Sequence, residues 1–124
     1  MNILGKRKAK SLEFEKKRIE SERMRTKYPD RIPVRVLRAP QCTKVPLVDK
    51  EKFLVPEDLS IGQFMYVIRK RVKLAPEVAL FLMVGKAGKT IPASSQIMSN
   101  LYNEFKDEDG FLYVTYTGEA TFGF

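Results

Sequence analysis

The chain has 124 residues, of which 44% are hydrophobic, so we expect one globular domain that buries its own core. It has no histidine and a single cysteine, Cys42, which excludes Ser-His and Cys-His catalytic pairs, histidine metal sites and intramolecular disulfides. Residues 1–38 carry 13 Lys or Arg and 5 Asp or Glu, a net charge of +8, whereas residues 39–124 carry 10 of each sign. The first third of the chain can therefore attract anionic lipid headgroups, acidic peptides, tubulin-like surfaces or nucleic acid, and charge alone does not choose among them.

Residues 1–10 are basic and fit either a short helix or a mobile arm. Ser11 is a suitable N-cap for a polar helix over about residues 12–26, which carries charge pairs at helical spacing such as Glu13–Lys17. The few apolar positions of this helix are Leu12, Phe14, Ile19 and Met24. So sparse a stripe predicts a helix on the outside of the domain.

Two short strands follow. Residues 32–38 read as a strand, in which Pro33 indicates an edge or an irregular start. Residues 51–55 read as a second strand, ended by Pro56.

The next helix has a clear start signal. Ser60 and Gln63 form a capping box, and Leu59 and Phe64 occupy the positions of a hydrophobic staple. The apolar positions with a 3.6-residue period are Ile61, Phe64, Met65, Ile68 and Val72. This period predicts one buried helix face.

The last third alternates strand, helix and strand. The apolar run Ala79–Val84 predicts a central strand, and Ser94 or Ser95 can cap a helix in which Ile97, Leu101 and Phe105 fall at positions i, i+4 and i+8. Residues 111–116 predict a final strand. We therefore expect an α+β roll: one domain over residues 1–116, with an N-terminal helical arm of about residues 1–27 and a flexible tail over residues 117–124.

Two segments resemble ligand loops without matching them. Residues 85–90 have two residues between their glycines where a phosphate-binding loop needs four, and residues 107–110 lack most ligands of a calcium loop. Cys42 has no partner base. We expect no cofactor, no metal and no catalytic residue.

Four segments carry a family resemblance: FEKKR (14–18), KYPDRIPVRV (27–36), KFLVPEDLSIGQFMYVIRKRV (52–72) and KDEDGFLYVTYTGEATFGF (106–124). Together they resemble the autophagy-related ubiquitin-like modifiers, the family of GABA-receptor-associated protein and the microtubule-associated light chains. The resemblance implies a ubiquitin-like β-grasp roll with an additional N-terminal helical segment.

The resemblance also implies a maturation and conjugation route. A cysteine protease would cleave after Gly123 and remove Phe124. E1-like and E2-like enzymes would then join Gly123 to phosphatidylethanolamine, moving a cytoplasmic protein to the autophagosomal membrane. Glycine suits this chemistry because a residue without a Cβ lets another chain approach its backbone closely.

A groove for receptors with an acid-flanked aromatic-x-x-aliphatic motif is the second implication, with the peptide added as a strand to a sheet edge. By matching position, the aromatic pocket would involve Glu20, Met24, Pro33, Lys52, Leu54 and Phe111. The aliphatic pocket would involve Phe53, Val55, Pro56, Leu59, Phe64 and Val67. The cations that meet the acids would be Arg31, Lys50, Lys52 and Arg71. Most of the apolar members also suit the core, and the lysines also suit the protection of a strand edge.

Two alternatives stay open. The chain could act as an unconjugated cytoskeletal or receptor-binding adaptor of the same fold, and its basic arm (Lys6, Arg7, Lys8 and Lys10) could meet a membrane, microtubules or only solvent. Nucleic-acid binding by residues 1–38 is a less favoured rival that strong salt dependence would reveal.

Overall fold

The computed structural model describes residues 3–87 and 90–118, with side chains from Ser11 onward. Its elements, in chain order, are α1 (Ile3–Lys27), β1 (Arg31–Arg38), β2 (Lys52–Pro56), α2 (Ile61–Arg71), β3 (Phe81–Val84), α3 (Met98–Phe105) and β4 (Leu112–Thr117). This order confirms the predicted succession of helices and strands. The predicted tail begins at the last residue of β4, and beyond Gly118 it lies outside the described residues.

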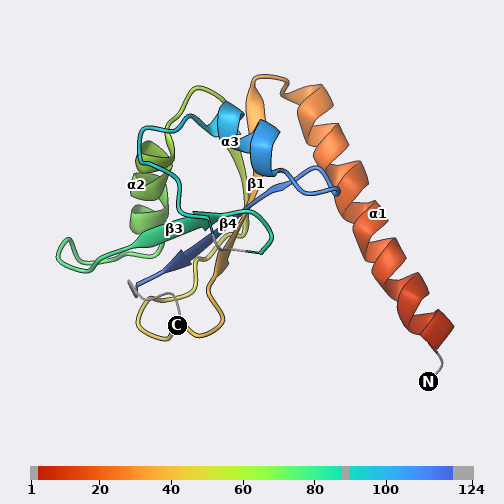
Figure 1. Cartoon of the computed structure of the whole chain (residues 1–124), viewed down its shortest axis with the longest axis horizontal. Helices are drawn as coiled ribbons and strands as arrows, with labels where there is room; N and C mark the ends of the chain where they lie inside the picture. The colour runs from red at the N-terminus through yellow and green to blue at the C-terminus, as the bar shows by residue number, and fades with distance from the viewer. Residues whose placement is uncertain (1–2, 88–89, 119–124) are drawn as a thin grey trace.

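The four strands form one mixed sheet in the order β2-β1-β4-β3 (Figure 1). β1 runs parallel to β4 and antiparallel to β2, while β3 runs antiparallel to β4. β3 is therefore an edge strand, and the prediction of a central strand over Ala79–Val84 is wrong. An apolar run indicates burial of a strand's faces, and it does not report how many strands lie beside it.

Pro33 lies near the start of β1, which is a central strand, so of the two predicted alternatives the edge strand is wrong and the irregular start is confirmed. The register explains why proline is tolerated there. Pro33 is the partner of Leu54 in β2, but pairing of β1 with β4 begins only at Val34. The nitrogen of Pro33 thus faces a stretch without a neighbouring strand, where no hydrogen-bond donor is needed.

The two faces of the sheet carry different helices. Alternate residues of β1, namely Ile32, Val34 and Val36, are at most 1% exposed and belong to the main core with Phe64 and Ile68 of α2. Helix α1 packs on the opposite face, and Figure 1 shows α1 and α2 on opposite sides of the sheet. The predicted α+β roll is confirmed.

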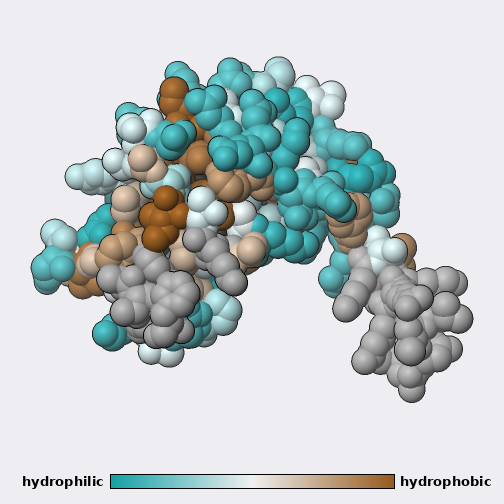
Figure 2. Space-filling view, in the orientation of Figure 1, coloured by the Kyte–Doolittle hydropathy of each residue, from teal (hydrophilic) through white to brown (hydrophobic). Residues whose placement is uncertain are grey.

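Helix α1 starts earlier than expected. It begins at Ile3, so Ser11 lies within the helix and the N-cap prediction at Ser11 is wrong. Residues 3–10 are mostly good helix formers, which favours continuation through Ser11. Arg18 forms ion pairs with Glu15 (2.8 Å) and Glu22 (2.7 Å), and the described surface of α1 is largely hydrophilic (Figure 2). Among the described residues, we find no helix with the length and apolarity needed to cross a bilayer.

The starts of α2 and α3 are stabilised differently. At α2 the predicted capping box is present: the Gln63 amide donates to Ser60 Oγ (3.1 Å), and the Ser60 amide donates to Gln63 Oε1 (2.9 Å). At α3 the prediction of a cap at Ser94 or Ser95 is wrong, because the N-cap is Ile97 without a side-chain hydrogen bond. The first amides of α3 instead donate to backbone carbonyls of the segment before α2, as in Met98 N to Leu59 O (2.8 Å).

Candidate peptide-binding site

The outer edge of β2 is the feature on which the candidate site is built. Among the described residues β2 pairs with β1 alone, so its other edge is open to a further strand. Because side chains alternate along a strand, Phe53 and Val55 point toward the core side, while Lys52 and Leu54 point toward α1. A strand added at this edge would likewise send alternate side chains to opposite faces of the sheet.

The predicted aliphatic pocket lies on the α2 side of β2. Phe53 and Phe64 meet edge to face with ring centroids 5.6 Å apart, and Phe53, Val55 and Phe64 are 8%, 3% and 1% exposed. These three residues are part of the core and form the floor of this region. The side chains left accessible are Val67, which is 40% exposed, the half-buried Leu59 and the exposed Pro56.

The predicted aromatic pocket lies on the α1 side. Glu20 of α1 accepts a hydrogen bond from Lys52 Nζ (2.7 Å), which ties the helix to β2. Met24 and Leu54 are half-buried, whereas Phe111 is fully buried and lies outside the main core. Pro33 is also buried on this face. The residues of the two predicted pockets therefore lie on the two sides of β2, as strand alternation requires.

Arg35 is a residue of this face that the sequence analysis missed. Its guanidinium carbon lies 4.6 Å from the centroid of the Phe111 ring, and its nitrogens lie 3.3 Å from Glu20 Oε1 and 3.3 Å from Glu51 Oε2. Its side chain is only 11% exposed, and its buried Nε has no hydrogen-bond partner in the described structure. A signal was available in the sequence, because Arg35 is two residues from Pro33 and so shares its strand face.

The turn before β4 holds Phe111 in place. Asp109 is 1% exposed, and its carboxylate accepts hydrogen bonds from the Phe111 amide (2.9 Å) and the Tyr113 hydroxyl (2.5 Å). Burial, together with this donation to Asp109, raises the pKa of Tyr113. Ser21 Oγ of α1 donates to the Asp109 carbonyl (2.6 Å). The turn thus joins α1 to the start of β4, next to Phe111 of the predicted aromatic pocket.

Cations lie at both ends of β2. Lys50 Nζ and the Arg71 guanidinium carbon lie 5.2 Å and 5.9 Å from the Phe53 ring centroid, and Arg71 pairs with Asp49 (3.2 Å). Arg31 lies at the other end, where it is the register partner of Pro56. An acid-flanked peptide along this edge would therefore meet positive charge near both of its ends.

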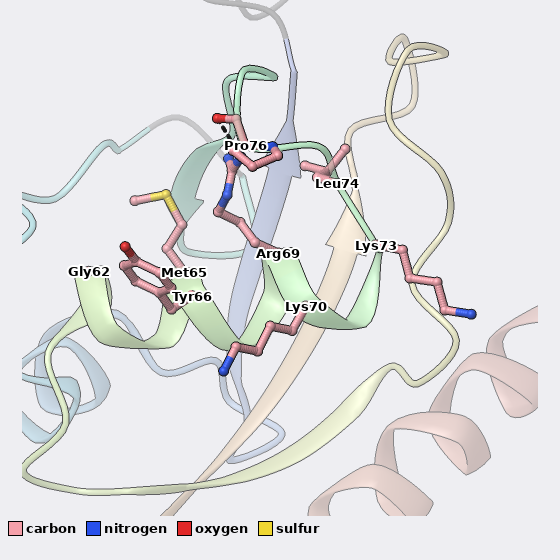
Figure 3. A pocket seen from close by; sticks show the side chains of 8 residues that line it. All are labelled: Gly62, Met65, Tyr66, Arg69, Lys70, Lys73, Leu74 and Pro76. Carbon is pink, nitrogen blue, oxygen red and sulfur yellow. Dashed lines mark hydrogen bonds between the residues drawn. The ribbon is translucent and has the colours of Figure 1, made fainter.

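A separate hollow of about 520 Å³ lies on α2 and the turn that follows it (Figure 3). The guanidinium of Arg69 is held there by the carbonyls of Ala75 (3.0 Å) and Pro76 (3.2 Å). The lining residues are Gly62, Met65, Tyr66, Arg69, Lys70, Lys73, Leu74 and Pro76. None of them belongs to the predicted peptide site, so a molecule in this hollow would not occupy either predicted pocket.

Gly123 and Phe124 lie outside the described residues, as do the side chains of the basic arm. Within residues 3–87 and 90–118 there is no cluster of three or more Cys, Asp or Glu side chains that could hold a metal ion.

Comparison with known proteins identifies the family. The sequence model described as "Autophagy protein Atg8 ubiquitin like" matches residues 16–123. The chain belongs to the Atg8 family. Its relatives include autophagy-related protein 8 of Mycosarcoma maydis, 58% identical over 110 residues that cover 89% of this chain and 90% of the relative. Autophagy-related protein 8c of Arabidopsis thaliana is 57% identical over 110 residues, 89% of each chain.

The fold agrees with a solved Atg8 structure. The crystal structure of Trypanosoma brucei ATG8 superposes with a TM-score of 0.76 at 40% sequence identity, covering 84% of this chain and 86% of that one. The ubiquitin-like β-grasp prediction and the predicted family are therefore confirmed. The chain is a ubiquitin-like protein of autophagy.

Proposed function

We propose that the chain is cleaved after Gly123 and joined through that residue to phosphatidylethanolamine by E1-like and E2-like enzymes. The match to the Atg8 sequence model supports this most directly, because it runs through Gly123 and stops before Phe124. A cytosolic protein treated in this way acquires a lipid anchor and moves to the autophagosomal membrane. Its role is that of a modifier and docking platform, without catalysis by this chain.

The test of conjugation follows the mass of the intact chain. Exposure to a maturation cysteine protease should remove one phenylalanine, and addition of the E1-like and E2-like enzymes with phosphatidylethanolamine vesicles should yield a lipidated species. Gly123→Ala should block the lipidated species. Membrane localisation that survives Gly123→Ala would instead favour the unconjugated adaptor.

We also propose that the open edge of β2 docks receptors carrying an acid-flanked aromatic-x-x-aliphatic motif. The geometry supports this: the outer edge of β2 is unpaired among the described residues, the residues of the two predicted pockets lie on its two faces, and Lys50, Arg71 and Arg31 lie toward its ends. Lys52 belongs to the edge strand β2 and also forms an ion pair with Glu20. The Lys52 side chain is 45% exposed and so remains accessible to a peptide carboxylate.

Lys52→Glu tests the docking proposal. The substitution removes one cation and places a carboxylate beside Glu20, so affinity for an acid-flanked peptide should fall about 10-fold, and less at high salt. Lys44→Glu, at an exposed lysine of the loop between β1 and β2, is a matched control with the same change in net charge. Equal affinities of the two variants would remove Lys52 from the site.

The basic arm offers a further contact for the conjugated protein. Positive charge near anionic headgroups contributes about 1 kcal/mol per Lys or Arg. Replacing Lys6, Arg7, Lys8 and Lys10 with Glu should weaken membrane or microtubule association, whereas unchanged association would assign the arm to solvent.

A further inference from the structure

Arg35 covers Phe111, a residue of the predicted aromatic pocket. Phe111 is fully buried, and the Arg35 guanidinium lies over its ring at 4.6 Å from the centroid. An aromatic side chain that enters from the β2 edge therefore reaches Arg35 before it reaches Phe111. The surface that such a ring meets is cationic and planar.

The polar contacts of Arg35 leave it free to adjust. Both of its ion pairs, to Glu20 and to Glu51, measure 3.3 Å, longer than the roughly 2.7–2.9 Å of strong charge-assisted hydrogen bonds. Glu20 is held more closely by Lys52, at 2.7 Å. The buried Arg35 Nε has no partner among the described residues. A small shift of the guanidinium would therefore break no short hydrogen bond of its own.

We propose that Arg35 is a specificity-determining residue of the aromatic pocket, selecting a tryptophan side chain by stacking between its indole and the buried ring of Phe111. This inference rests on the peptide-docking role proposed above. Guanidinium groups stack on aromatic faces, and among the aromatic side chains tryptophan attracts a cation most strongly.

The position of Arg35 adds a size preference. Arg35 is the register partner of Lys52, one strand inside the open edge. Adjacent strands are about 4.8 Å apart, so a peptide strand outside β2 lies roughly 10 Å from the backbone of Arg35. The indole is longer than a phenyl ring and extends further across β2, so both reach and electrostatics favour it.

Two acid-flanked peptides that differ only in carrying tryptophan or phenylalanine at the aromatic position would test this. Their affinities are measured by calorimetry on the full chain, its Arg35→Gln variant and its Arg35→Met variant. The ratio of the two affinities should fall about three-fold or more in both variants, because the cationic stacking surface is lost. Circular dichroism melts verify that each variant is folded. Two substitutions of Arg35 are used so that the test can still be made if one variant does not fold. Lys106→Gln is the matched control, since it removes a cation 5.2 Å from the Tyr102 ring and should leave the ratio unchanged.

Two outcomes would overturn the inference in distinguishable ways. An unchanged tryptophan-to-phenylalanine ratio in folded Arg35 variants, with Lys52→Glu still weakening both peptides, would leave the docking site intact and reject the role of Arg35. No binding of either peptide to the unmodified chain would reject the docking proposal and the inference together.

Discussion

Gly110 is a position where one added methyl group should test the docking of α1 on the domain. The residue has φ +86°, a conformation that L side chains rarely adopt. A Cβ built at Gly110 would collide with Ser21 Oγ and lie 3.0 Å from Ser21 Cβ. Ser21 is 1% exposed and donates to the Asp109 carbonyl, so its hydroxyl has little room to move.

The cost of Gly110→Ala can be worked from these contacts. Positive φ in a residue with a Cβ costs about 1–2 kcal/mol, and displacement of the Ser21 hydroxyl from the Asp109 carbonyl costs about 1 kcal/mol more. The free energy of unfolding should therefore fall by about 2–3 kcal/mol. For a domain of this size that corresponds to a drop in Tm of roughly 6–12 °C.

Urea unfolding of Gly110→Ala, Ser21→Ala and the double variant measures the effect and its cause. Ser21→Ala removes the oxygen that the new methyl group meets, so the double variant should lose less stability than the sum of the two single variants, by about 1 kcal/mol. Additive losses would show that α1 and the turn do not clash, and the packing of α1 described above would then be incorrect.

Substitutions at three further positions have defined outcomes. Ser60→Ala removes the capping box of α2 and should lower the free energy of unfolding by about 1 kcal/mol in urea titrations, whereas Ser60→Asp should retain most of it. Lys73 has φ 56° just after α2, and the Leu74 amide donates to the Arg69 carbonyl in a Schellman motif. Because glycine adopts this left-handed conformation without strain, Lys73→Gly should raise the free energy of unfolding by about 0.5–1 kcal/mol. A decrease would contradict the left-handed conformation of Lys73. Because burial and the bond to Asp109 raise the pKa of Tyr113 above its ordinary value of 10.0, the associated stability is fully present below about pH 10 and is lost as pH rises through the higher folded pKa. Tyr113→Phe should therefore show a shallower fall of Tm above pH 10, and parallel curves would reject the contribution of Tyr113.

Local signals predicted the elements of the domain well, and the positions of the strands less well. The capping box at Ser60 depends on four consecutive residues, so the sequence contains everything that defines it. The place of β3 at the sheet edge and of Pro33 inside β1 depends on pairing between distant segments. The start of α3 follows the same rule, because its amides are satisfied by carbonyls near Leu59 rather than by a neighbouring serine.

The candidate site divides in the same way. Strand alternation explains why Phe53 and Lys52 face opposite sides of β2, and this could be anticipated from the sequence. The stacking of Arg35 on Phe111 could not, because it requires the parallel register that places Arg35 opposite Tyr113, 78 positions later in the chain. Nothing between the two residues in sequence reports that register.

The shortness of β2 limits what can associate with it. Five residues at about 3.3 Å each give a backbone span of roughly 17 Å. A bound peptide strand of about five residues fills that span. Any longer peptide must continue over side chains beyond the end of β2. Selectivity among bound peptides must therefore come from their few side chains. The same short edge offers too few backbone hydrogen bonds to start the growth of a fibre by addition of further strands.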